Sequence, residues 1–218
     1  MSALPKRFEV LSRDEYLTRE YAAESRSEFF DGEVVAMAGA TITHVAIVAN
    51  LITTLSNQLR DGPCRVFNND LRVSIASGRR YVYPDVLVIC GAAEFEVGTQ
   101  NTVTNPVVII EVLSTSTVSI DRGLKFHAYQ ALSSLREYVL ISIRMRRIEV
   151  YRRDDQGGWR YESCPFLPSP IRLHSISCVL DLDEVYFRAE VPEEATEEYL
   201  GSTRPPEDET LDVADSDS

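Results

Sequence analysis

Two apolar segments that each carry a single carboxylate place the strongest constraint on how this chain can fold. The segment PVVIIEVLS, residues 106–114, sets Glu111 after four consecutive aliphatic residues, and YVYPDVLVIC, residues 81–90, sets Asp85 directly after Pro84. A continuous aliphatic run is typical of a central strand that is covered on both faces. Because an unpaired carboxylate in such a strand costs several kcal/mol, each acid needs a partner of opposite charge.

The two acids are predicted to meet at one end of a sheet. Pro84 removes a donor from the strand ladder, so Asp85 is expected at a strand edge, bulge or bend. Glu111 lies near the C-terminal end of its strand, before a Ser/Thr-rich loop. If the strands are neighbours, the carboxylates repel unless a proton or a cation lies between them. Mg²⁺ suits this ligand set because it commonly takes one or two carboxylates. The alternative, in which each acid pairs with an arginine, stays open.

The order of the predicted elements indicates a mixed α/β sheet flanked by helices. Capping residues stand at the N-terminal ends of the predicted helices. Asp31-Gly32 lies between two β-prone runs and predicts a hairpin. In chain order, the predicted elements are a helix over 13–22, a hairpin at 27–37, a helix over about 43–60, paired strands in CRVFNNDLRVSI and RRYVYPDVLVIC, a polar loop over 91–105, the strand PVVIIEVLS, a helix over about 119–132, and strands in EYVLIS, RRIEVYRR and WRYESCPF.

The composition is that of a soluble globular protein, with 44% hydrophobic and 26% charged residues in 218. No stretch approaches the roughly 20 apolar residues of a membrane span, and the N-terminal segment has no apolar core of a secretory signal. A cytoplasmic protein without a membrane partner is therefore expected. Its four cysteines form no C-x-x-C pair, so we expect free thiols at Cys64, Cys90, Cys164 and Cys178.

The net charge of −12 is distributed unevenly along the chain. Residues 190–218 contain eleven acids and one base, which leaves 23 acids against 21 bases in residues 1–189. We therefore expect a folded domain over 1–189 and an acidic, disordered tail over 190–218. Because the predicted domain is nearly neutral, the overall charge does not exclude a polyanionic partner such as DNA.

Lys125 is unusual because the chain uses arginine for almost every positive charge. Lys6 and Lys125 are the only lysines among 22 basic residues. A lysine is a compact point charge that can approach a phosphate, and its pKa can shift, which that of arginine does not. Asp121, Lys125 and Tyr129 share one helix face at a spacing of four residues. Taken alone, a solvated lysine on a helix remains the simpler interpretation.

These residues together resemble a known family. Pro84-Asp85, the segment EVLS at 111–114 and the segment DRGLKFHAYQALSSLREYVLI at 121–141 are similar to the bacterial "putative restriction endonuclease" domain family, within the PD-(D/E)XK nuclease superfamily. The resemblance runs from about Tyr16 to Asp183 and includes SEFFDGEVVAMAGATITH at 27–44. It implies an αβββαβ core, a divalent metal (Mg²⁺, with Mn²⁺ as a substitute), cleavage of phosphodiester bonds in DNA, and often a homodimer.

The resemblance assigns catalytic and metal-binding roles to Asp85 and Glu111. The lysine that the superfamily pattern places two residues after the second acid is Leu113 here, so Lys125 on the following helix is the expected replacement. Further members of the site are expected among residues that could equally be surface charges or packing residues, namely Glu28, Glu33, His44 and Tyr129. The chain is thus expected to be a Mg²⁺-dependent endodeoxyribonuclease. The alternative is a non-catalytic protein of the same fold that binds DNA or protein.

Arginines in the segment RMRRIEVYRR offer a second place for DNA contacts. A predicted hairpin carries Arg144, Arg146 and Arg147. These arginines could bind DNA phosphates, or their charge could prevent a solvated sheet edge from pairing with another strand.

The acidic tail leads to a test that needs no structure. If the tail competes with DNA for the domain, a truncated protein without residues 190–218 binds DNA more tightly than the full chain, since a short tether holds its charges at an effective concentration on the order of millimolar. The gain should shrink between about 50 and about 200 mM salt because both interactions are screened. Equal affinities at the lower salt would leave the tail with a solubilising role only.

Overall fold

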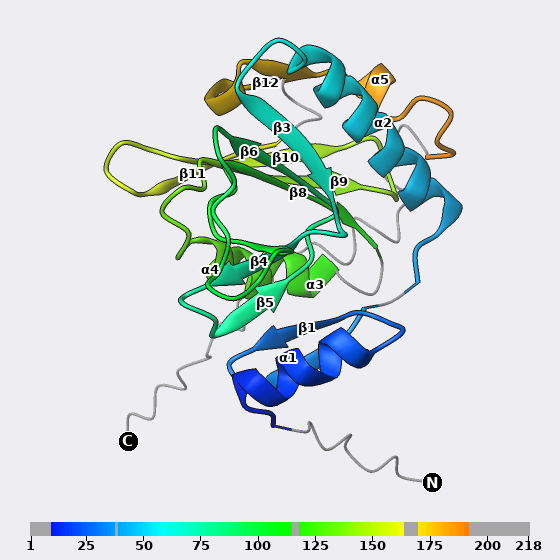
Figure 1. The fold of residues 1–218 in the computed structure, drawn as a ribbon. Coiled ribbons are helices and arrows are strands. Elements are labelled where there is room, and N and C mark those ends of the chain that lie inside the picture. The colour runs from blue at the N-terminus through cyan, green and yellow to red at the C-terminus, as the bar shows by residue number, and fades with distance from the viewer. Residues whose placement is uncertain (1–9, 38, 115–117, 164–169, 192–218) are drawn as a thin grey trace, which may run out of the picture.

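Two β-sheets that share a pair of bent strand segments form the centre of the protein (Figure 1). The computed structural model describes residues 10–37, 39–114, 118–163 and 170–191. The larger sheet has the order β11-β10-β9-β8-β6-β3, the second has the order β2-β1-β5-β4-β7, and β12 and β13 form a small hairpin. The mixed α/β class predicted from the sequence is confirmed.

The first half of the chain contains an N-terminal helix and hairpin, a long helix and the two bent strand segments. Its elements are α1 (Arg13–Ala22), β1 (Ser27–Phe30), β2 (Glu33–Ala36), α2 (Ile42–Gln58), β3 (Cys64–Asn68), β4 (Arg72–Ile75), β5 (Arg80–Val82), β6 (Val86–Cys90) and β7 (Thr102–Val103). The second half contains β8 (Val108–Leu113), α3 (Val118–Ile120), η1 (Asp121–Lys125), α4 (Phe126–Tyr129), β9 (Glu137–Ser142), β10 (Ile148–Arg153), β11 (Trp159–Ser163), β12 (Ile171–Leu173), η2 (His174–Ile176), β13 (Cys178–Leu180) and α5 (Leu182–Val185).

The αβββαβ core is formed by α2, β3, β6, β8, the α3–η1–α4 helix and β9. Strands β3, β6 and β8 pair antiparallel in succession, and β9 then returns parallel to β8, with Glu111 opposite Leu140. The parallel return requires the crossover that the helix supplies. This arrangement brings the C-terminal end of β8 next to the start of the helix that carries Lys125.

The two paired strands predicted over residues 64–75 and 79–90 each bend, and each contributes one segment to each sheet. The segment 64–75 divides into β3 and β4, and the segment 80–90 divides into β5 and β6. Pro84 lies in the break between β5 and β6, where its missing N–H costs no ladder hydrogen bond. The bend predicted at Pro84 is therefore confirmed, and it places Asp85 at the junction of the two sheets.

Alternating side chains of the larger sheet pack into two separate hydrophobic cores. Along β8, Val108, Ile110 and Val112 pack into the core that contains α2. Ile109 and Leu113 pack into the other core, with Ala128 and Tyr129 of α4 and with the second sheet. Because successive strand residues point to opposite faces, Glu111 shares its face with Ile109 and Leu113.

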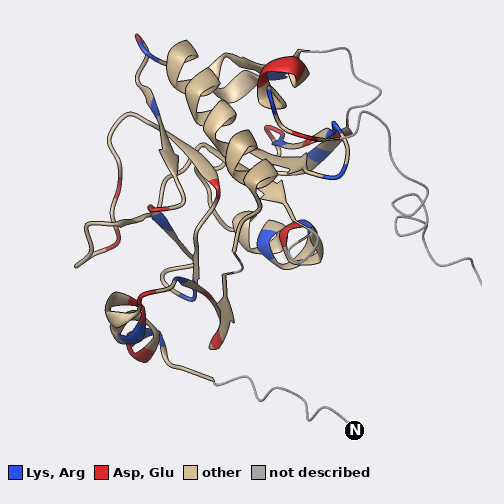
Figure 2. Cartoon of the chain, turned by 90° about the vertical axis from the view of Figure 1, so that its right-hand side faces the viewer, with Lys and Arg blue, Asp and Glu red and all other residues tan. Residues whose placement is uncertain are grey.

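Helix α2 covers one face of the larger sheet and contains no Asp, Glu, Lys or Arg (Figure 2). Thr41 is its N-cap, and the Thr41 side chain accepts a hydrogen bond of 3.2 Å from the backbone N–H of His44. Leu51 and Leu55 are fully buried against the sheet. The cap fixes the first turn of the helix, and that turn carries His44 to the junction of the sheets.

Two expectations about regular structure are corrected. The predicted helix over 119–132 is regular only at its ends, since its centre, η1, is a π-helix. Such wide turns occur frequently at functional sites, and a hydrophobic period does not reveal them. The predicted loop over 91–105 contains β7, which pairs parallel with β4. Two residues are too short a run to stand out in a sequence.

The expectation of free thiols is wrong for two of the four cysteines. Cys64 and Cys90 form a disulfide that joins β3 to β6 across 26 residues of chain. Their positions are directly opposite in the antiparallel pair, a neighbour relation that the spacing of cysteines in the sequence does not show. Cys178 is free and buried, and Cys164 lies outside the described residues.

The acidic tail predicted over 190–218 lies outside the described residues except for Glu190 and Val191. Within the described ranges, none of the helices combines the length and the apolar character needed to cross a membrane.

Reduction of the Cys64–Cys90 disulfide is expected to lower the free energy of unfolding. Closing a loop of 26 residues restricts the unfolded chain and contributes about 3.5 kcal/mol in the chain-entropy account. Urea unfolding with and without reductant should therefore show a lower midpoint in the reduced protein. A Cys64→Ser/Cys90→Ser variant is the control, because its midpoint should not respond to reductant. Mass spectrometry that finds both thiols free in non-reduced protein would contradict the pairing.

Candidate active site

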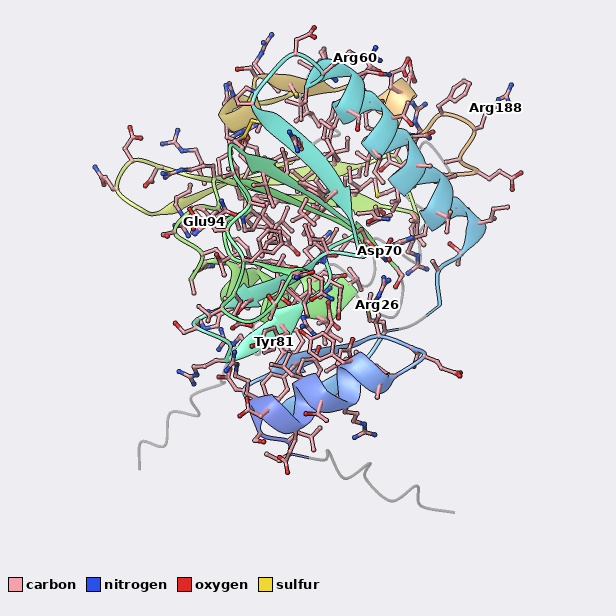
Figure 3. The ribbon with its side chains drawn as sticks, viewed as in Figure 1. Arg26, Arg60, Asp70, Tyr81, Glu94 and Arg188 are labelled. Atoms are coloured by element: carbon pink, nitrogen blue, oxygen red, sulfur yellow. A yellow bond between two sulfur atoms is a disulfide. The ribbon has the colours of Figure 1, made fainter. Side chains whose placement is uncertain are left out.

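A cavity of about 220 Å³ lies at the junction of the two sheets, beside the start of α2. The strand end of β8 brings Glu111 to it, the bend after Pro84 brings Asp85, and β1 brings Glu28. The first turn of α2 adds His44, and the π-helix adds Asp121 and Lys125. Arg26 and Asp70 form an ion pair next to Asn69 of the cavity wall (Figure 3).

The Lys125 ammonium group is surrounded by three carboxylates. Its Nζ lies 2.9 Å from Glu28 Oε1, 3.1 Å from Glu111 Oε1 and 3.2 Å from Asp121 Oδ1. All four residues are buried, with Lys125 only 6% exposed. Burying one such charge alone is strongly unfavourable, and here each charge has a partner of opposite sign. The prediction of a site lysine at Lys125 is consistent with this placement, whereas a solvated helix lysine is excluded.

Asp85 is connected to Glu111 through the backbone. The Val112 N–H donates a 2.8 Å hydrogen bond to Asp85 Oδ2, and His44 Nε2 lies 3.2 Å from the same oxygen. The Asp85 N–H approaches Glu111 Oε2 at 3.4 Å. In the described part of the chain, both side-chain contacts of Asp85 use Oδ2, so its Oδ1 is available to a ligand. The strand pairing of β6 and β8 thus holds the two acids in one cavity.

Two further groups orient the carboxylates. The Tyr129 hydroxyl donates a 2.7 Å hydrogen bond to Glu111 Oε1, and the Tyr83 backbone N–H donates a 3.1 Å hydrogen bond to Glu28 Oε1. Tyr83 lies directly before Pro84, in the break between the two sheets. The bend therefore also positions Glu28, which comes from a distant part of the chain.

Burial and charge shift the pKa values of the site in a common direction. Burial raises the pKa of Glu111 well above its ordinary value, although the Lys125 charge acts against this shift. Burial likewise raises the pKa of Glu28. For Lys125, burial acts to lower the pKa, but Glu111, Glu28 and Asp121 outweigh it and raise the pKa well above the ordinary value. The ammonium therefore stays charged, while protons bind to the acids more tightly than in water.

The predicted accessory residues divide into two groups. Glu28, His44 and Tyr129 join Asp85, Glu111 and Lys125, whereas Glu33 is exposed at the start of β2 and does not line the cavity. Asp121 was not selected from the sequence as a site residue. The available signal was its position four residues before Lys125, which is also the spacing of an ordinary surface ion pair.

Two arginines of the predicted DNA-binding hairpin, Arg146 and Arg147, pair with acids. Arg147 Nε lies 3.0 Å from Glu149 Oε1, and Arg122 Nη1 lies 2.5 Å from Glu149 Oε2. Arg146 pairs with Asp183 and lies over the ring of Tyr186. Because Glu149 is buried, the arginines neutralise a charge inside the protein. A phosphate-binding role for Arg144, Arg146 and Arg147 remains a prediction.

Three comparisons with known proteins bear on this site. A sequence model of the family Uma2, described as "Putative restriction endonuclease", matches residues 13–182. The chain belongs to this family. The matched range contains the cavity residues Glu28 to Lys125 and also Tyr129, which donates a hydrogen bond to Glu111.

Relatives of known sequence and structure agree with membership of the Uma2 family. The "Uncharacterized protein sll1609" of Synechocystis sp. is 39% identical over 150 residues, which cover 69% of this chain and 85% of the relative. The "Uncharacterized protein slr1290" of the same organism is 34% identical over 182 residues, which cover 82% and 93%. A crystal structure from Anabaena variabilis, described as "a putative nuclease belonging to DUF820", has a TM-score of 0.65 at 19% identity and covers 81% of this chain and 97% of that chain. At this identity the likeness shows the fold.

Replacing Glu111 by Gln is expected to change how stability depends on pH. Because the pKa of Glu111 is raised in the folded protein, its contribution to stability is fully present below about pH 4.3, the ordinary glutamate value, and is lost as the pH rises through the folded pKa. In urea unfolding with EDTA between about pH 4 and pH 8, the wild type should lose stability relative to Glu111→Gln as the pH rises. Glu33→Gln, at an exposed position, is the matched control and should follow the wild type. Parallel curves for wild type and Glu111→Gln would contradict a buried, proton-binding carboxylate.

Proposed function

We propose that this member of the Uma2 family is a metal-dependent endodeoxyribonuclease whose reaction takes place in the cavity at the sheet junction. The observation that carries the proposal is the approach of Lys125 Nζ to Glu111, 3.1 Å apart, in the same cavity as Asp85. The sequence has Leu113 where the superfamily pattern places a lysine. Lys125 supplies a positive charge beside the second acid from the following helix instead.

The residues of the cavity fit a divalent cation. In the described ranges, no three His, Cys, Asp or Glu side chains converge as a preformed metal cage. Mg²⁺ does not require such a cage, because it is usually held by one or two carboxylates and keeps several waters. Glu28, Glu111 and Asp121 contact the Lys125 ammonium group and Asp85 lines the same cavity, so the carboxylates exceed the buried positive charge of Lys125. Asp85 and Glu111 are the residues that would hold the ion.

A divalent ion bound there would supply Lewis-acid polarisation of a phosphate oxygen and a more acidic water. The protein's own groups prepare the cavity for that ion and for the substrate. Val112 N–H and His44 orient Asp85, and Tyr129 orients Glu111. Lys125 places a positive charge where the phosphate gains negative charge during cleavage, which is the kind of preorganised interaction that accelerates phosphoryl transfer.

The charge of the cavity also sets the order of binding. DNA phosphates are repelled by the excess of carboxylates until a cation reduces that charge. Glu111 must lose its tightly held proton before it binds a metal, so metal affinity should rise with pH. A requirement for both metal and neutral to basic pH follows from the same buried acids.

Plasmid nicking by the purified protein tests the proposal. Wild type should nick supercoiled DNA with Mg²⁺ or Mn²⁺ and not with EDTA. Asp85→Asn and Glu111→Gln should each abolish nicking and weaken metal binding in calorimetry, while the folded state without metal stays at least as stable because a negative charge is removed. Unchanged Mg²⁺ and Mn²⁺ affinities in both variants would refute the assignment of these two acids.

A non-catalytic binding protein gives a different result in the same assay. Such a protein, whether it binds DNA or another protein, does not nick the plasmid with either metal. If it binds DNA, it retards DNA in a gel-shift assay, and its DNA affinity does not depend on Asp85 or Glu111. Glu33→Gln is the matched control in the nicking assay, because it removes one carboxylate outside the cavity.

Replacing Lys125 by Ala should slow cleavage by about 10²-fold or more, as expected when one positioned charge is removed from a transition state, with a much smaller change in DNA affinity. Lys125→Arg should not restore the rate, since a guanidinium fork does not occupy the place of a point charge. Lys125→Ala also leaves three carboxylates without their cation and should destabilise the protein by roughly 3–5 kcal/mol.

A double variant separates the two effects of the Lys125 substitution. Glu28→Gln/Lys125→Ala removes one negative charge together with the positive one, so part of the lost stability should return. Cleavage should stay slow in the double variant. Wild-type turnover in a folded Lys125→Ala protein would show that the lysine has no part in the reaction.

A further inference from the structure

A second and larger cavity, of about 690 Å³, lies at the opposite end of the large sheet from the candidate active site. It is lined by residues at the C-terminal ends of β6 and β10, by the residues before β8 and β9, and by η2. Arg136 directly precedes β9, and Leu140 of β9 is opposite Glu111. Four residues of strand separate these positions by about 13 Å. Figure 3 shows Glu94, on the wall of this cavity, at the left of the molecule, and Arg26 and Asp70 right of centre.

One acid–base pair in the cavity wall is already complete. Arg152 Nε lies 3.0 Å from Glu137 Oε1, and Arg152 Nη1 pairs with Glu162. Glu137 is buried and also accepts hydrogen bonds from the backbone N–H groups of His174 and Ser175, both at 3.1 Å. These contacts tie η2 to the sheet, and Arg152 is not available to an anion because two carboxylates already share its single positive charge.

Arg136 and Arg153 remain as a pair of like charges. The Arg153 N–H donates to the Arg136 carbonyl at 2.8 Å, so the two residues are neighbours across β9 and β10. Among the described residues, neither guanidinium has a carboxylate partner. Arg153 lies over the ring of Trp159, donates to the Gln130 carbonyl, and has a buried Nε with no hydrogen-bond partner in the described ranges. Like charges directly opposite each other destabilise a sheet.

The positive charge of Arg136 affects the pKa of Arg153. Burial, and then the charge of Arg136, lower the pKa of Arg153 below its ordinary value. An anion between the two guanidinium groups would remove their repulsion and satisfy the buried Nε. Arginine presents its donors in a planar fork that matches phosphate oxygens. Two positive charges match the dianion of a phosphate monoester, which carries about −1.5 to −2 at pH 7, better than the single charge of each phosphodiester in a DNA backbone.

We propose that this cavity is a binding site for a phosphate monoester of nucleotide size, held through its phosphate by Arg136 and Arg153. The volume of the cavity falls within the roughly 300–1,000 Å³ that small-molecule sites occupy. Glu94 lines the same cavity, and its carboxylate has no side-chain partner among the described residues, so it opposes an anion from the rim. The site is separate from the carboxylate cluster and does not depend on the nuclease proposal.

Calorimetry with the full chain in EDTA tests the site, because chelation removes any binding that a metal at Asp85 and Glu111 would support. The probes are deoxyadenosine 5′-monophosphate, deoxyadenosine, inorganic phosphate and a short DNA duplex without terminal phosphates. We expect the monophosphate to bind and deoxyadenosine not to bind. Arg136→Gln should weaken binding of the monophosphate by about tenfold or more, as expected for lost hydrogen bonds to a charged group. Glu94→Gln should tighten it.

Two controls keep the result interpretable. Arg60→Gln, at the far end of α2 (Figure 3), removes an exposed arginine outside the cavity and should bind as the wild type does. Arg136 is exposed, so Arg136→Gln should fold, and its melting temperature without ligand should equal or exceed that of the wild type because the repulsion from Arg153 is relieved.

Each outcome decides the proposal. Inorganic phosphate that binds as tightly as the monophosphate supports the phosphate site and shows that the phosphate group alone supplies the affinity. No binding of either phosphate probe overturns the proposal, as does equal monophosphate affinity in wild type and Arg136→Gln. The proposal is also overturned if Arg136→Gln reduces the affinity for the duplex as much as the affinity for the monophosphate. That result would show that Arg136 belongs to a surface that binds the DNA backbone.

Discussion

The buried ammonium group of Lys125 is the interaction on which the rest of the structure depends. Glu28, Glu111 and Asp121 come from β1, β8 and the π-helix, and each lies within 3.2 Å of the Lys125 nitrogen. Without that one cation, three separate elements would bring like charges together in a low-dielectric interior. The ion cluster therefore joins the second sheet, the large sheet and the crossover helix at a single point, where hydrophobic packing alone would not favour carboxylates.

The bend at Pro84 gives this cluster its access to a ligand. The chain leaves one sheet and enters the other at this proline. As a result, the Tyr83 N–H donates a hydrogen bond to Glu28, and the Asp85 side chain accepts one from the Val112 N–H. A straight strand would pair along its whole length and could engage the backbone N–H of Tyr83 in the ladder instead of with Glu28. The cavity is thus a consequence of dividing two strands between two sheets, and its acids belong to both.

Much of the fold and the core of the site could be predicted from the sequence. The helix over 13–22, the Asp31-Gly32 hairpin and the bend at Pro84 follow from local chemistry, which acts over a few residues. Asp85, Glu111 and Lys125 stand out because each breaks a local pattern of apolar or arginine-rich sequence. Asp121 and the Cys64–Cys90 disulfide could not be found in this way. Their roles depend on a π-helical turn and on strand register, which are set by contacts between distant segments.

The alternation of β8 between two cores makes the register of this strand sensitive to charge. A shift of β8 by one residue would turn Glu111 toward α2 and would place Ile110 or Val112 among the three charged partners. Helix α2 contains no lysine or arginine that could meet a carboxylate there. The misregistered chain would therefore bury one unpaired anion in one core and remove one of the three carboxylates around Lys125 in the other. The charged cluster thereby rejects wrong strand pairings during folding, before any ligand is bound.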